Sequence, residues 1–226
     1  MRPAQLEAAR KTAGRTQREA AARLGVSQPY YSQLESGSRP MPDELALTVV
    51  RKLRLPPATL PLPTLSQSVK PLPPDELAAA LARLGYPGFA HLRKAARPTN
   101  PAEVVARALA HDDLDPRLVE GLPWVLATFH DLDWQWLVAQ CRLLDLQNRL
   151  GFLVALAAQL AKPGAAEPLR AALVDLERSR LASEGTVCRD KMSDAERNWM
   201  RGRRSADAAH WNLLTTLIVE HLNNAT

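Results

Sequence analysis

Polar side chains suited to reading DNA bases gather in one short segment, residues 27–37 (SQPYYSQLESG). A glutamine amide carries a donor beside an acceptor, so it can bond N6 and N7 of adenine as a pair. If the segment is a helix, Tyr31 and Leu34 share its buried stripe. The side chains left facing outward, which we expect to read bases, are Gln28, Tyr30, Ser32 and Gln33.

The elements that would position these side chains are indicated by the residues around them. Thr16 and Glu19 form a capping-box pattern, which predicts a helix that begins directly after the threonine. Gly25 supplies the left-handed residue that ends this helix and turns the chain. Ser27 caps a second helix, and Pro29 falls in its first turn, where the missing amide costs nothing. The sequence therefore predicts two short helices joined by a glycine turn.

This pattern resembles the Xre or Cro type helix-turn-helix of phage and bacterial repressors. The resemblance covers roughly residues 5–57, with an opening helix (LEAARKTAG) before the motif and a closing helix (DELALTVVRKL) after it. It implies that the second helix of the motif lies in the DNA major groove. It also implies an ion pair between Arg10 in the first helix and Glu35 at the end of the recognition helix. Pro29 and Tyr31 depart from the family's pattern, so its base preference does not carry over.

Phosphate contacts are predicted around the same motif. Gln17 begins its helix, where a side chain and backbone amides can hold a phosphate together. Residues 1–55 contain ten Lys or Arg and five Asp or Glu, whereas the remaining 171 residues contain 19 of each. Such basic residues supply most non-specific affinity for DNA. The predicted phosphate contacts are Arg15, Gln17, Arg18, Ser27 and Arg39, with Lys52 and Arg54 as further candidates.

The chain has 226 residues, 46% of them hydrophobic, which allows two domains with a core in each. We expect an all-α fold, with a five-helix type of helix-turn-helix domain over residues 1–55 and a larger helical bundle domain over residues 75–226. Between them, seven of the nineteen residues 56–74 are proline, which favours an extended, semi-rigid linker. The alternative is an ordered arm that packs along the second domain. The leucines available for such packing are Leu60, Leu62 and Leu65.

Helical periodicity runs through most of the second domain, and no strand pair is predicted. The densest apolar block, residues 122–161, holds two helices that are apolar round more than half their circumference. Such helices lie at the centre of a bundle or in a dimer interface, and a palindromic DNA site favours a homodimer. The predicted helices span residues 75–84, 87–96, 101–111, 116–129, 133–145, 146–161, 165–183, 193–202 and 206–222.

The second domain also resembles the helical C-terminal regions of Xre-type regulators that are encoded beside nucleotidyltransferase-like toxins. The similar segments are LDPRLVEGLPWVL, LQNRLGFLVALA and AAHWNLL. This resemblance implies an antitoxin or phage-defence regulator that represses its own operon and contacts a toxin or other protein partner. The alternative is an antitoxin that acts mainly by binding protein, with DNA binding secondary.

A more remote alternative is a HEPN-like ribonuclease, because Arg204 and His210 fit the Arg-x(4–6)-His spacing of that class. The spacing arises readily by chance in an Arg-rich chain, and the sequence contains no phosphate loop, nucleophile elbow or paired-carboxylate motif. We therefore predict no enzyme and no catalytic residue. Cys141 and Cys188 lack a CxxC pattern and a nearby His, which predicts reduced thiols, with Cys141 in the core, and no metal or cofactor.

The basic cluster of residues 197–204 is open to three interpretations: a solvated face, a second nucleic-acid contact, or a docking site for an acidic partner. Its arginines are Arg197, Arg201, Arg203 and Arg204. No run approaches 18 apolar residues, and the first residues do not read as a signal peptide. We expect a cytoplasmic protein whose partners are double-stranded operator DNA and a second copy of itself, with no membrane contact.

Overall fold

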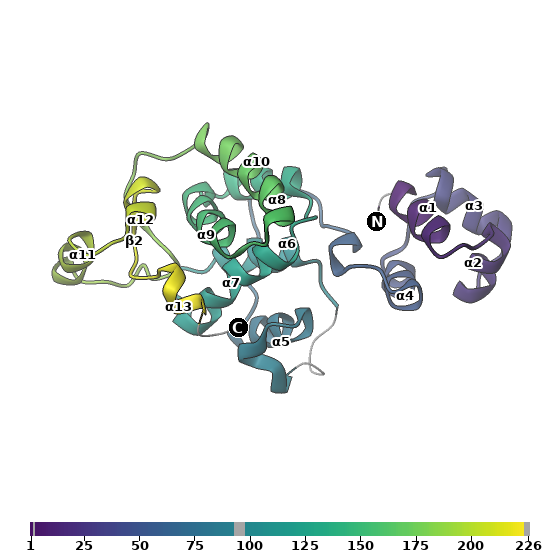
Figure 1. The fold of residues 1–226 in the computed structure, drawn as a ribbon, viewed down its shortest axis with the longest axis horizontal. Coiled ribbons are helices and arrows are strands. Elements are labelled where there is room, and N and C mark those ends of the chain that lie inside the picture. Colours follow the sequence, from purple (N-terminus) through teal and green to yellow (C-terminus); the bar gives the residue numbers. More distant parts are fainter. Residues whose placement is uncertain (2, 93–97, 224–226) are drawn as a thin grey trace. The chain divides into compact units, whose positions relative to one another are not determined.

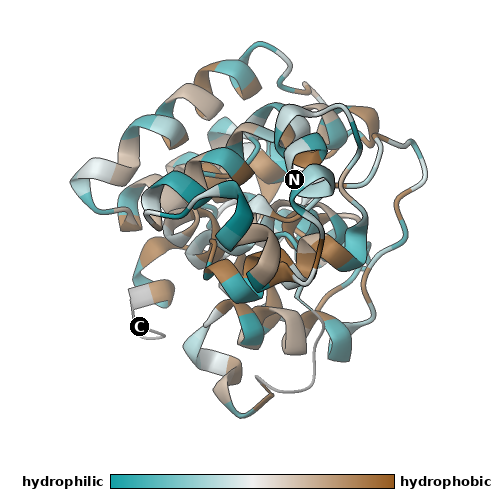
Figure 2. Ribbon diagram, turned by 90° about the vertical axis from the view of Figure 1, so that its right-hand side faces the viewer, coloured by the Kyte–Doolittle hydropathy of each residue, from teal (hydrophilic) through white to brown (hydrophobic). Residues whose placement is uncertain are grey.

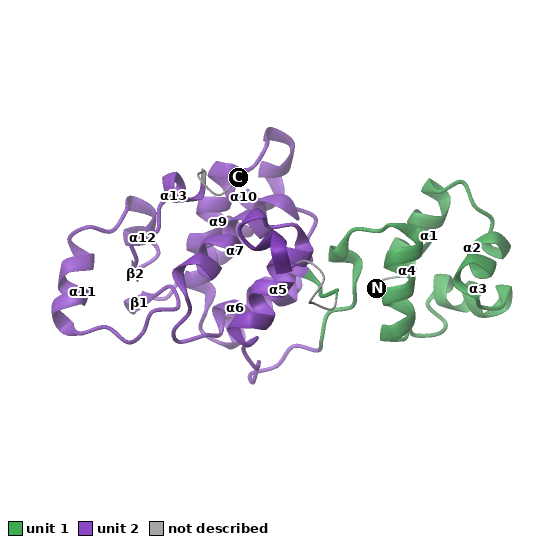
Figure 3. Ribbon diagram, turned by 90° about the horizontal axis from the view of Figure 1, so that it is seen from below, with its two compact units in different colours: residues 1–63, 98–100 green, residues 64–97, 101–226 purple. Residues whose placement is uncertain are grey.

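The computed structural model describes residues 1, 3–92 and 98–223. The chain divides into two compact units (Figure 3). Unit 1 comprises Met1–Pro63 with Pro98–Asn100, and unit 2 comprises Thr64–Arg97 with Pro101–Thr226. Helices make up most of both units (Figure 1), which confirms the all-α prediction.

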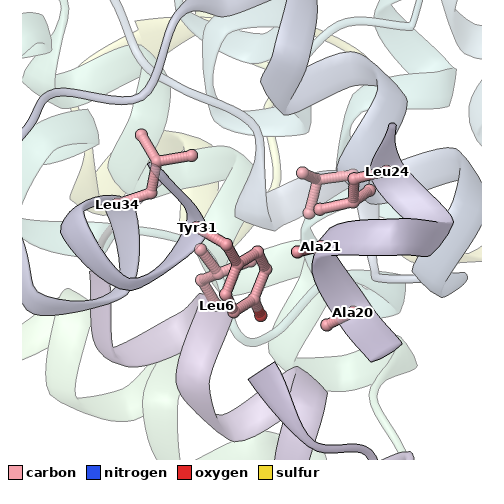
Figure 4. Close-up of a cluster of buried hydrophobic side chains, with 7 residues drawn as sticks. Leu6, Ala20, Ala21, Leu24, Tyr31 and Leu34 are labelled. Carbon is pink, nitrogen blue, oxygen red and sulfur yellow. The ribbon is translucent and has the colours of Figure 1, made fainter. Parts of the chain in front are cut away.

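Unit 1 is a small helical domain whose helices surround one apolar core. Its helical elements are α1 (Pro3–Thr12), α2 (Gln17–Leu24), α3 (Gln28–Ser36), α4 (Asp43–Leu53) and the 3-10 helix η1 (Pro57–Thr59). The core is drawn in Figure 4 and consists of Leu6, Ala20, Ala21, Leu24, Tyr31, Leu34 and Val49. The alanines of α2 let α3 approach closely, so the two helices of the predicted motif pack directly on each other. The fifth helix of the expected domain is a single 3-10 turn.

The ends of α2 and α3 are set by the residues that the sequence singles out. The Thr16 side chain accepts a hydrogen bond from the backbone N–H of Glu19, and the Glu19 carboxylate accepts one from the backbone N–H of Thr16. Gly25 has a φ of 78°, a left-handed conformation that a residue with a Cβ adopts only at a cost. The Ser27 side chain caps α3 by accepting from the N–H of Tyr30. The predicted helix, turn and second helix are confirmed.

Unit 2 is a bundle in which nine of the 14 residues of α9 are buried. Helix α9 contacts α7, α8 and α10, and its largest apolar side chains are buried inside the unit. Both hydrophobic and hydrophilic residues occur on most helices, as Figure 2 shows. The elements are α5 (Pro74–Leu84), η2 (Pro87–Leu92), α6 (Pro101–Leu109), α7 (Pro116–Thr128), α8 (Trp134–Leu143), α9 (Gln147–Leu160), η3 (Pro163–Ala165), α10 (Ala166–Glu177), β1 (Gly185–Thr186), α11 (Asp194–Arg201), α12 (Ala206–His210), β2 (Leu213–Leu214) and α13 (Val219–Asn223).

The prediction of one continuous helix over residues 206–222 is wrong. Helix α12 ends at His210, and the chain then forms β2, which pairs in parallel with β1. Asn212 has a φ of 53°, and its carbonyl accepts the N–H of Gly185 at 2.9 Å. Asparagine tolerates this left-handed conformation better than most residues, so the helix stops here and a strand pair follows. The prediction of no strand pair is wrong for the same reason.

Two other predicted helices also differ from the structure. Helix α10 ends at Glu177, whereas the sequence pattern extends to residue 183. The Asn148 amide donates to the carbonyl of Leu181 at 2.9 Å and accepts its N–H at 2.8 Å. This long-range pair replaces the hydrogen bonds that a longer helix would make. Of the predicted helix 87–96, residues 87–92 form the 3-10 helix η2, and residues 93–96 lie outside the described residues.

The proline-rich segment is divided between the two units. In unit 1, Asn100 donates to the carbonyls of Ala58 and Leu60 at 3.1 and 2.7 Å. Residues 64–73, called the arm below, belong to unit 2, whereas Leu60 and Leu62 of the alternative interpretation lie in unit 1. Leu65 is 43% exposed, so it does not anchor the arm, whereas Leu72 is buried. The anchors are mainly hydrogen bonds to the arm backbone, which apolar patterning does not reveal.

Gly151 in α9 faces the ring of Trp211, which leaves no room for a side chain at this position. A Cβ at position 151 would lie 2.4 Å from two ring atoms of Trp211. We expect Gly151→Ala to lower the free energy of unfolding of unit 2 by about 2 kcal/mol, because overpacking outweighs the gain in helix propensity. Urea unfolding followed by tryptophan fluorescence measures this, since all five tryptophans lie in unit 2.

The matched control is Gly164→Ala in η3, where an added Cβ meets no atom of the described residues within 4 Å. It should leave the urea midpoint nearly unchanged. Equal midpoints for the two variants would contradict the role assigned to the Trp211 contact.

Candidate nucleic-acid interface

Helix α3 has one buried and one outward face. Tyr31, Leu34 and Glu35 are buried. Gln28 and Gln33 are exposed, as helical spacing predicts, whereas Ser32 is only partly exposed. Ser36 is exposed on the same side and was not predicted, although its position three residues after Gln33 could have indicated it. The outward face of α3 is therefore made of amide and hydroxyl side chains.

A chain of side-chain hydrogen bonds connects the first helix to this outward face. Arg10 Nε donates to Glu35 Oε1 at 2.7 Å, which is the ion pair that the family resemblance implies. Gln17 Nε2 donates to the other carboxylate oxygen of Glu35 at 2.6 Å. Gln28 Nε2 in turn donates to Gln17 Oε1 at 3.0 Å. Helices α1, α2 and α3 thus each contribute to fixing the orientation of the Gln28 amide.

The buried end of this series of hydrogen bonds pairs an arginine with a glutamate. The Glu35 and Arg10 side chains are only 5% and 15% exposed. The hydrogen bond to Glu35 raises the pKa of the Arg10 guanidinium above its already high value. Burial, and then the negative charge of Glu35, raises the pKa of the Tyr31 phenol to about 12. The Arg10 guanidinium is therefore charged and the Tyr31 phenol is neutral at physiological pH.

Tyr30 and Arg39 lie together at the edge of the outward face. The Tyr30 side chain is half-buried and packs against the core of unit 1. The Arg39 guanidinium lies 4.8 Å from the centre of the Tyr30 ring, in the geometry of a cation–π contact. Tyr30 is thus less outward than helical spacing alone suggests. Its ring holds a predicted phosphate-binding arginine in place.

The remaining predicted phosphate contacts surround the starts of α2 and α3. Arg15 and Arg18 flank the residues that begin α2, and Arg18 is exposed. The carbonyl of Arg15 accepts a hydrogen bond from Arg10 Nη1 at 2.9 Å, which ties the loop before α2 to α1. Ser27 is exposed while its hydroxyl caps α3. The amino ends of both helices therefore carry the basic or hydroxyl side chains that a phosphate contact requires.

In unit 2, the two residues of the ribonuclease alternative have different partners. His210 Nε2 lies 2.8 Å from a carboxylate oxygen of Glu177. Arg204 Nη1 lies 3.7 Å from Glu184. The structure therefore does not place this pair around a common site.

The basic cluster of residues 197–204 is largely engaged in contacts within unit 2. Arg201 donates to both carboxylate oxygens of Glu184, at 2.9 and 2.6 Å, and this contact lowers the pKa of Glu184. Arg197 donates to the carbonyl of Asp190. Arg203 stacks on the ring of Trp199 at 4.6 Å, and Trp199 remains 51% exposed.

Both cysteines are buried and free. Burial raises the pKa of the Cys141 thiol to about 12 and that of the Cys188 thiol to about 11. Neither is therefore a reactive thiolate at neutral pH, and the predicted place of Cys141 in the core is confirmed. Within the described residues there is no group of three or more side chains suited to holding a metal ion. None of the described helices has the length and apolar character needed to cross a membrane.

Comparison with known proteins identifies unit 1 and leaves unit 2 without a match. Residues 6–60 match the family model described as Helix-turn-helix. No curated protein and no solved structure matches the chain. The matched residues include α2, α3 and every residue of the hydrogen-bond chain that ends at Gln28. Residues 6–60 are therefore similar to the Xre-like helix-turn-helix domains with which transcription regulators bind DNA.

Proposed function

We propose that this protein binds a specific operator as a dimer and represses transcription, including that of its own operon. The observation that carries base recognition is the hydrogen-bond chain from Arg10 through Glu35 and Gln17 to Gln28. An amide that is oriented before DNA arrives loses less conformational entropy on binding. Gln28 and Gln33 then face base edges in the major groove, with Tyr30 and Ser32 beside them.

Phosphate contacts complete the proposed interface. Arg15, Gln17 and Arg18 at the start of α2, with Ser27 and Arg39 around α3, would hold the DNA backbone on both sides of the recognition helix. The excess positive charge of residues 1–55 supports this placement.

We expect Gln28→Ala and Gln33→Ala each to weaken operator binding by about 1 to 3 kcal/mol and to leave binding to random DNA nearly unchanged. The operator is first identified by sequencing the DNA that co-precipitates with the protein, where a palindromic peak upstream of its own gene supports autoregulation. Affinities are then measured by fluorescence anisotropy. Gln135→Ala, an exposed glutamine of unit 2, is the control. Equal losses on operator and random DNA would show that neither glutamine reads bases.

Our proposal of a dimer is supported by the symmetry of palindromic operators and not by the apolar block of residues 122–161. Helix α9, the last helix of that block, packs against α7, α8 and α10 of the same chain. The apolar side chains that α8 and α10 leave exposed are Leu143 and Val174, at 41% and 57%. They are available to a second copy. Sedimentation of the full chain with and without operator DNA tests the stoichiometry.

The second candidate is an antitoxin that acts mainly by binding a protein. Its support, besides the resemblance of unit 2 to toxin-associated regulators, is the exposed Trp199 stacked by Arg203 on α11. Tryptophan and arginine are the residue types that most often anchor protein interfaces. A protein partner that binds the full chain without DNA, and binds Trp199→Ala more weakly, would favour this candidate. Both candidates place the protein in the cytoplasm and involve no cofactor.

A further inference from the structure

Unit 2 contains a polar cavity of about 520 Å³ that the DNA-binding function does not use. Its walls come from the loop after α6, the loop between α8 and α9, the start of α9, residues 181–186 and the arm. A cavity of this size is in the range that small-molecule sites occupy.

Unusual backbone conformations surround this cavity. The described residues include four non-glycine residues with positive φ, and three of them lie in or beside its walls. Asp145, with a φ of 55°, lines the cavity, and Asn212 directly precedes a lining residue. Cys188 follows two residues after the lining residue Thr186. Such conformations persist only where the surrounding structure holds them, and they cluster at ligand sites.

The charges in the walls favour a cation. Arg149 lines the cavity, but its guanidinium already donates to both carboxylate oxygens of Asp190 at 3.0 and 2.9 Å and to the carbonyls of Leu109 and His111. It is therefore not available to bind an anion. Asp112 and Asp145 also line the cavity, and neither makes an ion pair with another described residue. The unbalanced charge of the cavity is thus negative.

The arm supplies one wall of the cavity. Hydrogen bonds hold the arm backbone both before and after the residues that form this wall. Gln67, Ser68 and Val69 line the cavity. Before them, the Gln140 side chain accepts the N–H of Ser66 at 3.0 Å and donates to its carbonyl at 2.6 Å. After them, Arg107 donates to the carbonyl of Lys70 at 2.9 Å, and the His111 ring lies 2.6 Å from the carbonyl of Leu72. Continuing toward the amino terminus, the arm leads into the helix-turn-helix domain.

We propose that this cavity binds a small organic amine that also carries hydrogen-bonding groups, and that the bound amine stabilises the docked arm. Asp112 and Asp145 bind the ammonium group, and the polar side chains of the arm and of residues 181–186 bind the rest of the molecule. Because the arm continues into the DNA-binding domain, occupancy of the cavity regulates operator binding. This regulatory part rests on the proposed function, whereas the amine site does not.

Binding is tested on the full chain without DNA by isothermal titration calorimetry at constant ionic strength. The probes are ethanolamine, 1,4-diaminobutane and spermidine, with 1,4-butanediol as the neutral match of the diamine. We expect at least one amine to bind and the diol not to bind. Failure of all three amines, or equal binding of the diol, would overturn the proposal.

The matched variants are Asp112→Asn with Asp145→Asn, compared with Asp131→Asn. Asparagine keeps the shape of aspartate and tolerates the left-handed conformation of residue 145, so the double variant should fold with an unchanged unfolding midpoint. Asp131 is exposed and does not line the cavity. We expect amine affinity to fall at least tenfold in the double variant and to stay unchanged in Asp131→Asn. Equal effects would assign the binding to general surface charge and contradict the site.

The role of the arm is measured by hydrogen exchange of the peptide that covers residues 64–73. The bound amine should slow exchange severalfold in the parent chain and leave it unchanged in the double variant. Amine binding without slower exchange would refute the coupling to the arm while leaving the site in place. Since neither measurement involves DNA, a negative result here leaves operator recognition by Gln28 and Gln33 to its own test.

Discussion

Replacing Glu35 with alanine should lower the free energy of unfolding of unit 1 by about 4 kcal/mol, the largest effect that we expect of any single substitution. Glu35 is 5% exposed and accepts hydrogen bonds from Arg10 and Gln17. Its removal leaves a largely buried guanidinium without its carboxylate, and that desolvated charge dominates the cost. It also releases Gln17, which positions Gln28, so operator affinity should fall even under conditions where unit 1 stays folded.

The tryptophans make this loss measurable within the intact chain. All five lie in unit 2, so fluorescence follows that unit, whereas far-ultraviolet circular dichroism follows the helices of both. In urea, Glu35→Ala should show an early transition by dichroism and an unchanged one by fluorescence. The control is Glu7→Ala, which breaks the exposed ion pair of Glu7 with Lys11 on α1 and should leave both transitions in place. An unaltered dichroism transition in Glu35→Ala would show that the buried pair does not stabilise unit 1.

The second large effect concerns the salt dependence of operator binding. Neutralising Arg15, Arg18 and Arg39 together should lower the slope of log affinity against log salt by up to about three units, because each phosphate contact contributes about 0.9. At 0.1 M salt this corresponds to a loss of roughly 10²-fold or more in affinity. The measurement is fluorescence anisotropy over a series of salt concentrations, on operator and on random DNA.

The matched control neutralises the basic cluster of residues 197–204. Its arginines are engaged with Glu184, with the carbonyl of Asp190 and with the Trp199 ring, so they release few counterions on binding DNA. The slope should therefore remain nearly unchanged, and the fluorescence-detected unfolding transition checks that unit 2 stays folded. A large change in slope would mean that unit 2 also binds nucleic acid. His210 would then be the residue to mutate next, because the ribonuclease alternative would regain support.

Local sequence signals were sufficient for the helix-turn-helix itself. The capping box of Thr16 and Glu19, the left-handed Gly25 and the Ser27 cap involve residues at most a few positions apart. Their geometry depends on backbone sterics and nearby hydrogen bonds, which a sequence displays directly. The Arg10–Glu35 pair spans 25 positions, and it was predictable only through the family resemblance. The outward positions of Gln28 and Gln33 followed from helical spacing.

Only the tertiary structure decided which partners the polar side chains take. The sequence predicts a phosphate contact for Gln17. In the folded domain without DNA, its side chain hydrogen-bonds to Glu35, 18 positions away, and to Gln28, 11 positions away. The arm is held by Gln140 from 74 positions away, and Asn148 ends α10 by pairing with Leu181. An amide can satisfy its hydrogen bonds with many partners of similar energy, so its choice depends on which groups the packed helices bring within reach. Caps and apolar stripes therefore determine the helices, whereas long-range packing determines the site.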